Sequence, residues 1–171
     1  PKINKKNRSY RILFVFGKLH TSHDYQANIG CDQKGPQMKQ YVIDTSVVMK
    51  YLTDKGSAAG VWLLKALKDK QTKLLSSDLF RFEVTNAIRY SPTSQENLPK
   101  QIMAVLSLPI KIVGVSDKGF SEIAKMAKEN NTTVYDTSYH FLAISMDGIF
   151  VTCDRDYFQK SRHLGYIEYL G

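Results

Sequence analysis

Four acidic residues stand out because the expected secondary structure does not fully account for them. Two of them follow apolar runs: Asp44 comes after Tyr41-Val-Ile, and Asp154 comes after Ile149-Phe-Val-Thr-Cys. Each therefore ends a predicted strand, and in an open parallel sheet ligands bind beyond the carboxyl ends of the strands. We expect these two carboxylates to face one crevice, although either aspartate alone could equally cap the helix that follows it.

The other two acids are assigned to helices. Asp136 directly precedes a helix predicted over 137–146 and could serve as its cap. Glu83 falls in the second turn of a helix predicted over 78–90, about 60° from Phe80 on the apolar arc, at about 100° per residue. A carboxylate facing the core is costly unless a basic partner or a bound cation neutralises it.

Taken as a set, the four acids indicate a metal site. Clustered carboxylates repel and raise one another's pKa values unless a cation lies among them. Oxygen ligands without a Cys or His pattern suit Mg²⁺ or Mn²⁺, and the two cysteines, Cys31 and Cys153, have no ligand spacing. The chemistry that fits is phosphodiester hydrolysis, in which one ion activates water and a second can stabilise the leaving oxygen.

The elements that must position these residues alternate along the chain. The strand candidates are 41–44, 73–76, 110–115, 149–152 and 166–169, and the helical patterns lie at about 46–53, 57–70, 78–90, 95–107, 117–129 and 137–146. Such alternation predicts parallel strands joined by crossover helices, and the strands are apolar throughout, as expected when both faces of a sheet are covered. We therefore predict an α/β fold: a three-layer domain with a short parallel sheet of about five strands flanked by helices.

Charge separates the beginning of the chain from the rest. The net charge of the 171 residues is +8, and residues 1–40 hold eight Lys or Arg against two acids. A basic chain favours polyanionic partners without specifying which polyanion. No stretch approaches the ~18 consecutive apolar residues that a membrane span needs, so we expect no membrane association and a cytoplasmic location.

Four short motifs carry a resemblance to a known family. They are Ile43-Asp44-Thr45-Ser46, Glu83-Val-Thr-Asn86, Tyr135-Asp136-Thr-Ser-Tyr139 and Val151-Thr152-Cys-Asp154. Each motif alone is weak, but together they resemble PIN domains, and more narrowly the VapC-type toxins of prokaryotic toxin–antitoxin pairs. The resemblance covers 39–171 and implies a PIN-like nuclease domain there, preceded by a basic extension of uncertain origin at 1–38.

The resemblance implies an endoribonuclease that depends on Mg²⁺ or Mn²⁺. The catalytic residues, which would hold the metal directly or through water, would be Asp44, Glu83, Asp136 and Asp154. Supporting roles would fall to the hydroxyls of Ser46 and Thr152, to Asn86 one turn beyond Glu83, and to Asp156, a spare acid whose ordinary alternative is a solvated helix start. The family also implies an RNA substrate, a homodimer and a small antitoxin partner.

Basic and aromatic residues around this site are candidates for RNA contact. The basic ones are Lys50, Lys55, Arg81, Arg89 and Arg155, each of which could equally be a solvated surface residue. Such contacts position the RNA backbone without reading its sequence. Tyr51, Tyr139 and Tyr157 could stack on unpaired bases, although each is equally expected as a packing residue.

The sequence departs from the family pattern at two neighbouring positions. His140 and Phe141 stand where related sequences usually carry small or aliphatic residues. We expect His140 on the helix surface, with contact to a phosphate as the alternative, and Phe141 in the core.

The motifs suggest a mechanism and leave rival interpretations open. One ion would be held chiefly by Asp44, Asp136 and Asp154, while Glu83 orients the attacking water or shares a second ion, leaving 5′-phosphate and 3′-hydroxyl ends. The alternatives are a non-toxin PIN protein in RNA processing, a catalytically silent PIN scaffold that binds RNA or protein, and a functional role confined to the basic extension. A haloacid-dehalogenase-like phosphatase is disfavoured because it would place an acid where Ser46 stands.

Overall fold

The computed structural model describes residues 38–91 and 97–171. The predicted basic extension, 1–38, lies outside the described residues except for its last position, as does the beginning of the helix predicted over 95–107. In the described part of the chain, no helix is long and apolar enough to cross a membrane.

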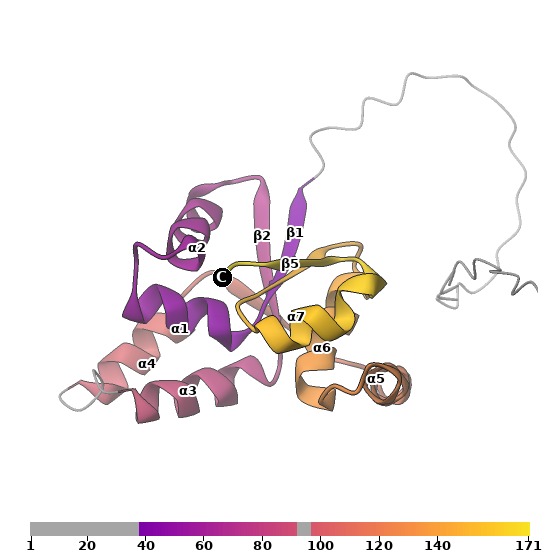
Figure 1. Ribbon diagram of the computed structural model, residues 1–171. Helices are drawn as coiled ribbons and strands as arrows, with labels where there is room; N and C mark the ends of the chain where they lie inside the picture. The colour runs from indigo at the N-terminus through magenta and orange to yellow at the C-terminus, as the bar shows by residue number, and fades with distance from the viewer. Residues whose placement is uncertain (1–37, 92–96) are drawn as a thin grey trace, which may run out of the picture. The chain divides into compact units, whose positions relative to one another are not determined.

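A single parallel sheet organises the described part of the chain (Figure 1). Its strands are β1 (Lys39–Ile43), β2 (Thr72–Ser77), β3 (Ile110–Val113), β4 (Ile149–Thr152) and β5 (Ile167–Tyr169). They lie in the order β3-β2-β1-β4-β5, and every neighbouring pair is parallel. The predicted parallel sheet of about five strands is confirmed.

The strand order creates a switch point between β1 and β4. The chain builds outward from β1 to β2 and β3, then returns to the other side of β1 to form β4 and β5. In register, Ile43 pairs with Val151, so the residues that follow these two strands emerge at the same level. Sheets of this kind bind ligands at such a point, where the two connections diverge.

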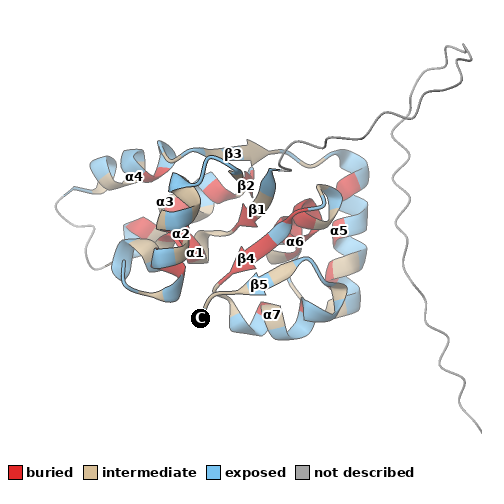
Figure 2. Cartoon of the chain, turned by 90° about the horizontal axis from the view of Figure 1, so that it is seen from above, coloured by how far each residue is buried: buried red, intermediate tan, exposed pale blue. Residues whose placement is uncertain are grey.

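The helices of the described residues cover both faces of the sheet. They are α1 (Thr45–Thr53), α2 (Ala58–Lys68), α3 (Phe80–Tyr90), α4 (Leu98–Leu106), α5 (Asp117–Asn130), α6 (Val134–Ser145) and α7 (Arg155–Ser161), with a 3₁₀ turn, η2 (Arg162–Leu164). Parallel crossovers are right-handed, so α1 to α4 lie on one face and α5 to α7 on the other. This three-layer arrangement is visible in Figure 2.

The core is densest where α6 crosses the sheet. Val42, Ile43 and Val151 are fully buried, and every side chain of α6 from 137 to 143 is buried (Figure 2). This helix contacts β1, β2 and β4 on one side and α5 on the other. A Cβ at Gly119 would crowd the contact between α5 and α6, because it would lie 2.6 Å from Val115 Cγ1 and 3.2 Å from Phe141 Cε1. Phe141 is buried, so its predicted place in the core is confirmed.

Two local features differ from the prediction. Helix α6 begins at Val134 rather than 137, because Thr133 caps it: the Thr133 hydroxyl accepts a hydrogen bond from the Asp136 amide at 3.0 Å. Asp136 is therefore inside the first turn and is not the cap. The short helix α7 was given no range in the prediction, although a helix capped by Asp154 was one of the alternatives; Asp154 does cap it, by accepting from the Tyr157 amide at 2.9 Å.

Candidate active site

Asp44 occupies the centre of the carboxyl edge of the sheet. Its Oδ1 accepts hydrogen bonds from the Ser46 hydroxyl at 2.5 Å and from the Val47 amide at 3.3 Å, so it caps α1. Its Oδ2 accepts from the Thr152 hydroxyl at 2.6 Å. Burial raises the pKa of Asp44 from 3.8 to about 6, and the strongest opposing influences are these hydroxyl and amide donors rather than cations. Asp44 therefore caps α1, and burial disfavours the charged form of its carboxylate.

Thr152 joins Asp44 to the next strand end. Its fully buried hydroxyl donates to Asp44 and accepts from the Asp154 amide at 2.9 Å. A second bridge runs through Ser46, whose hydroxyl accepts from the Cys153 amide at 2.8 Å. Hydrogen bonds therefore join the ends of β1 and β4, which the two aspartates follow, at the switch point.

Glu83 is half-buried on α3 and is held by two hydroxyls. Its Oε2 accepts from Thr45 at 3.1 Å and from Tyr139 at 2.5 Å. Both donors are neutral, so they do not supply the positive charge of a structural ion pair. Burial raises the pKa of Tyr139, and the nearby Glu83 and Asp44 raise it further. Tyr139 therefore remains a hydrogen-bond donor at any ordinary pH.

Asp136 approaches the same region from α6. It is half-buried, and its Oδ2 accepts from the Thr133 hydroxyl at 2.6 Å. Tyr157 of α7 connects it electrostatically to Asp154: burial raises the pKa of Tyr157 to about 12, and both carboxylates contribute to the increase. Glu83 and Asp44 thus both raise the pKa of Tyr139, and Asp136 and Asp154 both raise that of Tyr157.

The described residues do not contain three Asp, Glu, His or Cys side chains close enough together to enclose an ion. Each carboxylate is instead turned toward hydroxyl or amide donors of its own. The donor set, four carboxylates with flanking hydroxyls, fits Mg²⁺ or Mn²⁺, which prefer oxygen ligands.

The expected surface position of His140 is wrong. Its side chain is fully buried between Tyr157, whose hydroxyl lies 3.1 Å from Nδ1, and Gly165, whose carbonyl oxygen lies 2.7 Å from Nε2. Because a carbonyl can only accept, Nε2 carries the proton and Nδ1 accepts from Tyr157. Burial lowers the pKa of His140 to about 4. The residue was misplaced because the sequence does not show that α7 and the turn at Gly165 pack against this face of α6.

The remaining candidate residues lie at or near the surface. Asn86 and Asp156 are exposed, as are the basic residues Lys50, Arg81, Arg89 and Arg155. Lys50 is near enough to Cys153 to lower its pKa, against the larger raising effects of burial and Asp44.

The three tyrosines proposed for base stacking divide into two groups. Tyr139 and Tyr157 are only 1% and 4% exposed, so they are packing residues and cannot stack on RNA. Tyr51 is half-buried, and the Lys55 ammonium lies 5.7 Å from the centre of its ring.

Sequence reasoning missed the residues that hold Glu83. Thr45 and Tyr139 both lie inside the quoted motifs, yet their hydroxyls were not assigned to the glutamate. The available signal was the shared helical face that Tyr139 makes with Asp136, three residues earlier. A partner 56 residues away can be chosen only when the strand order is known.

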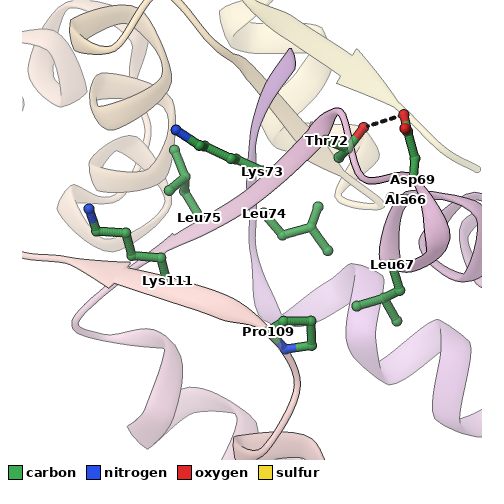
Figure 3. Close-up of a pocket in the computed structure, with 9 residues that line it drawn as sticks. All are labelled: Ala66, Leu67, Asp69, Thr72, Lys73, Leu74, Leu75, Pro109 and Lys111. Atoms are coloured by element: carbon green, nitrogen blue, oxygen red, sulfur yellow. Dashed lines mark hydrogen bonds between the residues drawn. The ribbon is translucent and has the colours of Figure 1, made fainter. Parts of the chain in front are cut away.

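A pocket elsewhere on the sheet does not involve the four acids (Figure 3). It opens at the amino ends of β2 and β3, where Thr72 donates a hydrogen bond to Asp69 at 2.8 Å and Pro109 closes one side. The aspartates at the strand ends lie at the opposite edge of the sheet.

Comparison with protein-family models supplies the deciding observation: the PIN domain model matches residues 41–163. The chain belongs to the PIN domain family. This match spans all four acids of the candidate site. A comparison with curated protein sequences found no significant match.

Several solved structures share the fold. VapBC2 from Rickettsia felis, bound to a DNA fragment from its promoter, matches with a TM-score of 0.57 and 14% identity over 77% of this chain and 99% of that one. Mycobacterium tuberculosis VapC20, a toxin that cleaves the sarcin-ricin loop, matches with a TM-score of 0.55 and 15% identity over 77% and 99% of the two chains. PAE2754 from Pyrobaculum aerophilum matches with a TM-score of 0.54 and 21% identity over 74% and 87%.

Proposed function

We propose that this PIN domain is an endoribonuclease dependent on Mg²⁺ or Mn²⁺, with Asp44, Glu83, Asp136 and Asp154 as its catalytic acids. The observation that carries the proposal is the state of Asp44. It is a half-buried carboxylate at the switch point, its pKa is raised to about 6, and Thr152 connects it to the backbone of Asp154. Perturbed acids in this setting are typical of functional sites, and a divalent cation would relieve the perturbation.

The residues divide into those that would hold metal and those that hold the acids in place. Asp44, Asp136 and Asp154 would be the chief ligands, and Glu83 would orient the attacking water or share a second ion. A bound divalent ion supplies Lewis acidity, making water more acidic and offsetting negative charge on the phosphate. Thr152 donates a hydrogen bond to Asp44, and Tyr139 donates one to Glu83, so each hydroxyl would help to orient one of the carboxylates.

The products expected are 5′-phosphate and 3′-hydroxyl ends, because water would attack the phosphorus in line and the P–O3′ bond would break, with the 3′-oxygen leaving; the ribose 2′-hydroxyl takes no part. No serine or cysteine nucleophile is required. Cys153 suits that role poorly, because burial and Asp44 raise the pKa of its thiol to about 11.

We further propose that the protein is the toxin of a type II toxin–antitoxin pair, acting as a homodimer that a small antitoxin holds inactive. The support is the shared fold with VapBC2 of Rickettsia felis and with a toxin–antitoxin complex from Klebsiella pneumoniae, which matches with a TM-score of 0.58. Growth arrest on induction of the wild type, absent with Asp44→Asn, would support this role. Unimpaired growth with active nuclease present would indicate an RNA-processing role instead.

The first experiment measures cleavage of a mixed, end-labelled RNA pool by the full chain with Mg²⁺ or Mn²⁺. Wild type is compared with Asp44→Asn, which removes the charge and keeps the shape. Asp147→Asn is the matched control, because Asp147 is exposed at the amino end of β4 and its φ of 49° suits asparagine.

We expect cleavage by the wild type to require the metal and to stop when EDTA is added. Cleavage should be lost in Asp44→Asn and should survive in Asp147→Asn. A folded wild-type protein that binds divalent ions without cutting any RNA would refute the nuclease and favour the silent scaffold. Products ending in a 2′,3′-cyclic phosphate would refute the proposed chemistry.

A further inference from the structure

A second pocket lies between α7 and the end of the chain. Its lining residues are Arg155, Phe158, Gln159, Arg162, Tyr169 and Gly171. The first four are spaced as i, i+3, i+4 and i+7, so α7 and its C-terminal cap present one continuous face to the pocket. Tyr169 is the last residue of β5, so one wall of the pocket lies at the carboxyl edge of the sheet, the edge at which Asp44 and Asp154 follow their strands.

The two arginines make this pocket strongly positive. Both side chains are exposed, and among the described residues neither guanidinium has a hydrogen-bond, ion-pair or ring partner. Beneath them, Phe158 and Tyr169 stack with ring centres 5.5 Å apart and planes inclined by 26°. A guanidinium stays charged at any ordinary pH and presents a fork of N–H donors that matches a phosphate. The pocket thus combines a packed floor with two cations that have no anion of their own among the described residues.

Both walls of the pocket are linked to the carboxyl edge of the sheet, where the candidate catalytic acids Asp44 and Asp154 lie. Asp154 is the N-cap of α7, and Arg155 is the first residue of that helix. On the other wall, the Leu170 amide donates to the Thr152 carbonyl at 2.9 Å, next to the hydroxyl that holds Asp44. An anion between the arginines would therefore lie along the same edge as the acids.

We propose that this pocket is a subsite for the phosphodiester backbone of the RNA strand, next to the bond that is cut. The proposal rests on the proposed ribonuclease function. Arg155 and Arg162 are seven residues apart, about 10 Å along a helix axis, so they contact two different phosphates. Such contacts neutralise the strand and set its direction across the site without reading its bases.

Binding is measured with the full chain carrying Asp44→Asn and a labelled single-stranded RNA, across a series of salt concentrations. Each phosphate contact in a single strand contributes about 0.7 to the slope of log affinity against log salt. Arg155→Gln and Arg162→Gln are each expected to reduce the slope by about 0.7 and to weaken binding severalfold at low salt.

Two further variants separate charge from packing. Arg162→Lys keeps the charge and is expected to restore most of the slope. Lys68→Gln is the surface control, because Lys68 is exposed at the end of α2 that leads to the amino edge of the sheet. It is expected to leave both slope and affinity unchanged.

The outcomes are distinguishable from those of the nuclease test. In the cleavage assay, the two Arg→Gln exchanges should raise KM and leave kcat nearly unchanged, as expected for residues that bind ground state and transition state alike. If the wild type cleaves RNA, but the variant carrying both Arg155→Gln and Arg162→Gln keeps the wild-type KM and salt-dependence slope, the subsite is overturned and the nuclease is not. An altered slope in a protein that cuts nothing supports the subsite and refutes the nuclease. Absence of RNA binding, or an affinity loss equal at all salt concentrations, also overturns the proposal.

Discussion

Replacing Asp44 by asparagine is expected to stabilise the metal-free protein at neutral pH while it abolishes cleavage. Asp44 is half-buried, and burial raises its pKa from 3.8 to about 6. Between these two values the folded state binds more protons than the unfolded state. The free energy of unfolding therefore falls as pH rises through this interval, and it stays lower at neutral pH.

The magnitude follows from the shift and from the hydrogen bonds. A difference of about two pKa units corresponds to about 3 kcal/mol, at about 1.4 kcal/mol per unit. The neutral amide of the Asp44→Asn variant would avoid this cost, and its oxygen could keep the bonds that Oδ1 accepts from Ser46 and Val47. Its NH₂ group would replace the oxygen that accepts from Thr152, at a cost of about 1 kcal/mol. The net gain at pH 7 is therefore about 2 kcal/mol.

The assay is urea denaturation of both proteins with EDTA, from acid to slightly alkaline pH. The quantity of interest is the difference between the two free energies of unfolding, because other groups that titrate in the same range, such as His140, cancel in it. This difference should change from slightly negative below the unfolded pKa of Asp44 to about +2 kcal/mol at neutral pH. Added Mg²⁺ should then stabilise the wild type and leave Asp44→Asn unaffected.

A variant that is less stable than wild type at neutral pH, in the absence of metal, would refute this reasoning. So would a difference that does not depend on pH, because it would indicate that Asp44 titrates normally in the folded protein. Asp147→Asn again serves as the control, since the exposed side chain of Asp147 should give a difference near zero at every pH.

Three further substitutions test the surroundings of the acids. Thr152→Val removes a buried hydroxyl that donates to Asp44. It should lower the rate of cleavage, and in urea denaturation it should lower the free energy of unfolding by about 2 kcal/mol. An unchanged free energy of unfolding would exclude the hydrogen bond between Thr152 and Asp44. Tyr139→Phe removes a donor to Glu83 and should increase the metal concentration needed for half-maximal cleavage. If that concentration stays the same, Glu83 lies outside the metal site. Burial lowers the pKa of His140 to about 4, so the contribution of His140 to the free energy of unfolding should fall by up to about 1.4 kcal/mol per unit as pH drops from 6.5, opposite in sign to that of Asp44. The free energy of unfolding of wild type minus that of His140→Gln isolates this contribution in acid denaturation, and a difference that does not change with pH would contradict the assigned burial.

The features that follow from local sequence were predictable. Strands and helices alternate, and the period of their apolar residues is a property of short segments. Asp44 and Asp154 each end a strand, so parallel pairing was enough to place both at one edge of the sheet. Glu83 was expected near the core because of its helical face, and it is half-buried in the structure.

The partners of these residues depend on which strands become neighbours. The Thr152–Asp44 contact spans 108 residues, and it exists because β4 pairs with β1 rather than with β3. The burial of His140 has a similar origin, since Tyr157 and Gly165 belong to the segment between β4 and β5, which contacts α6 when these two strands pair.

The sequence by itself therefore determined the type of fold, the order of the acids and their place at the ends of elements. Tertiary structure decided the ionisation of Asp44, the hydroxyls that hold Glu83, and the pocket that joins Arg155 and Arg162 to Tyr169. The physical reason is that desolvation and long-range hydrogen bonding depend on what covers a group. The covering segments are chosen by the strand order, which no single stretch of the chain encodes.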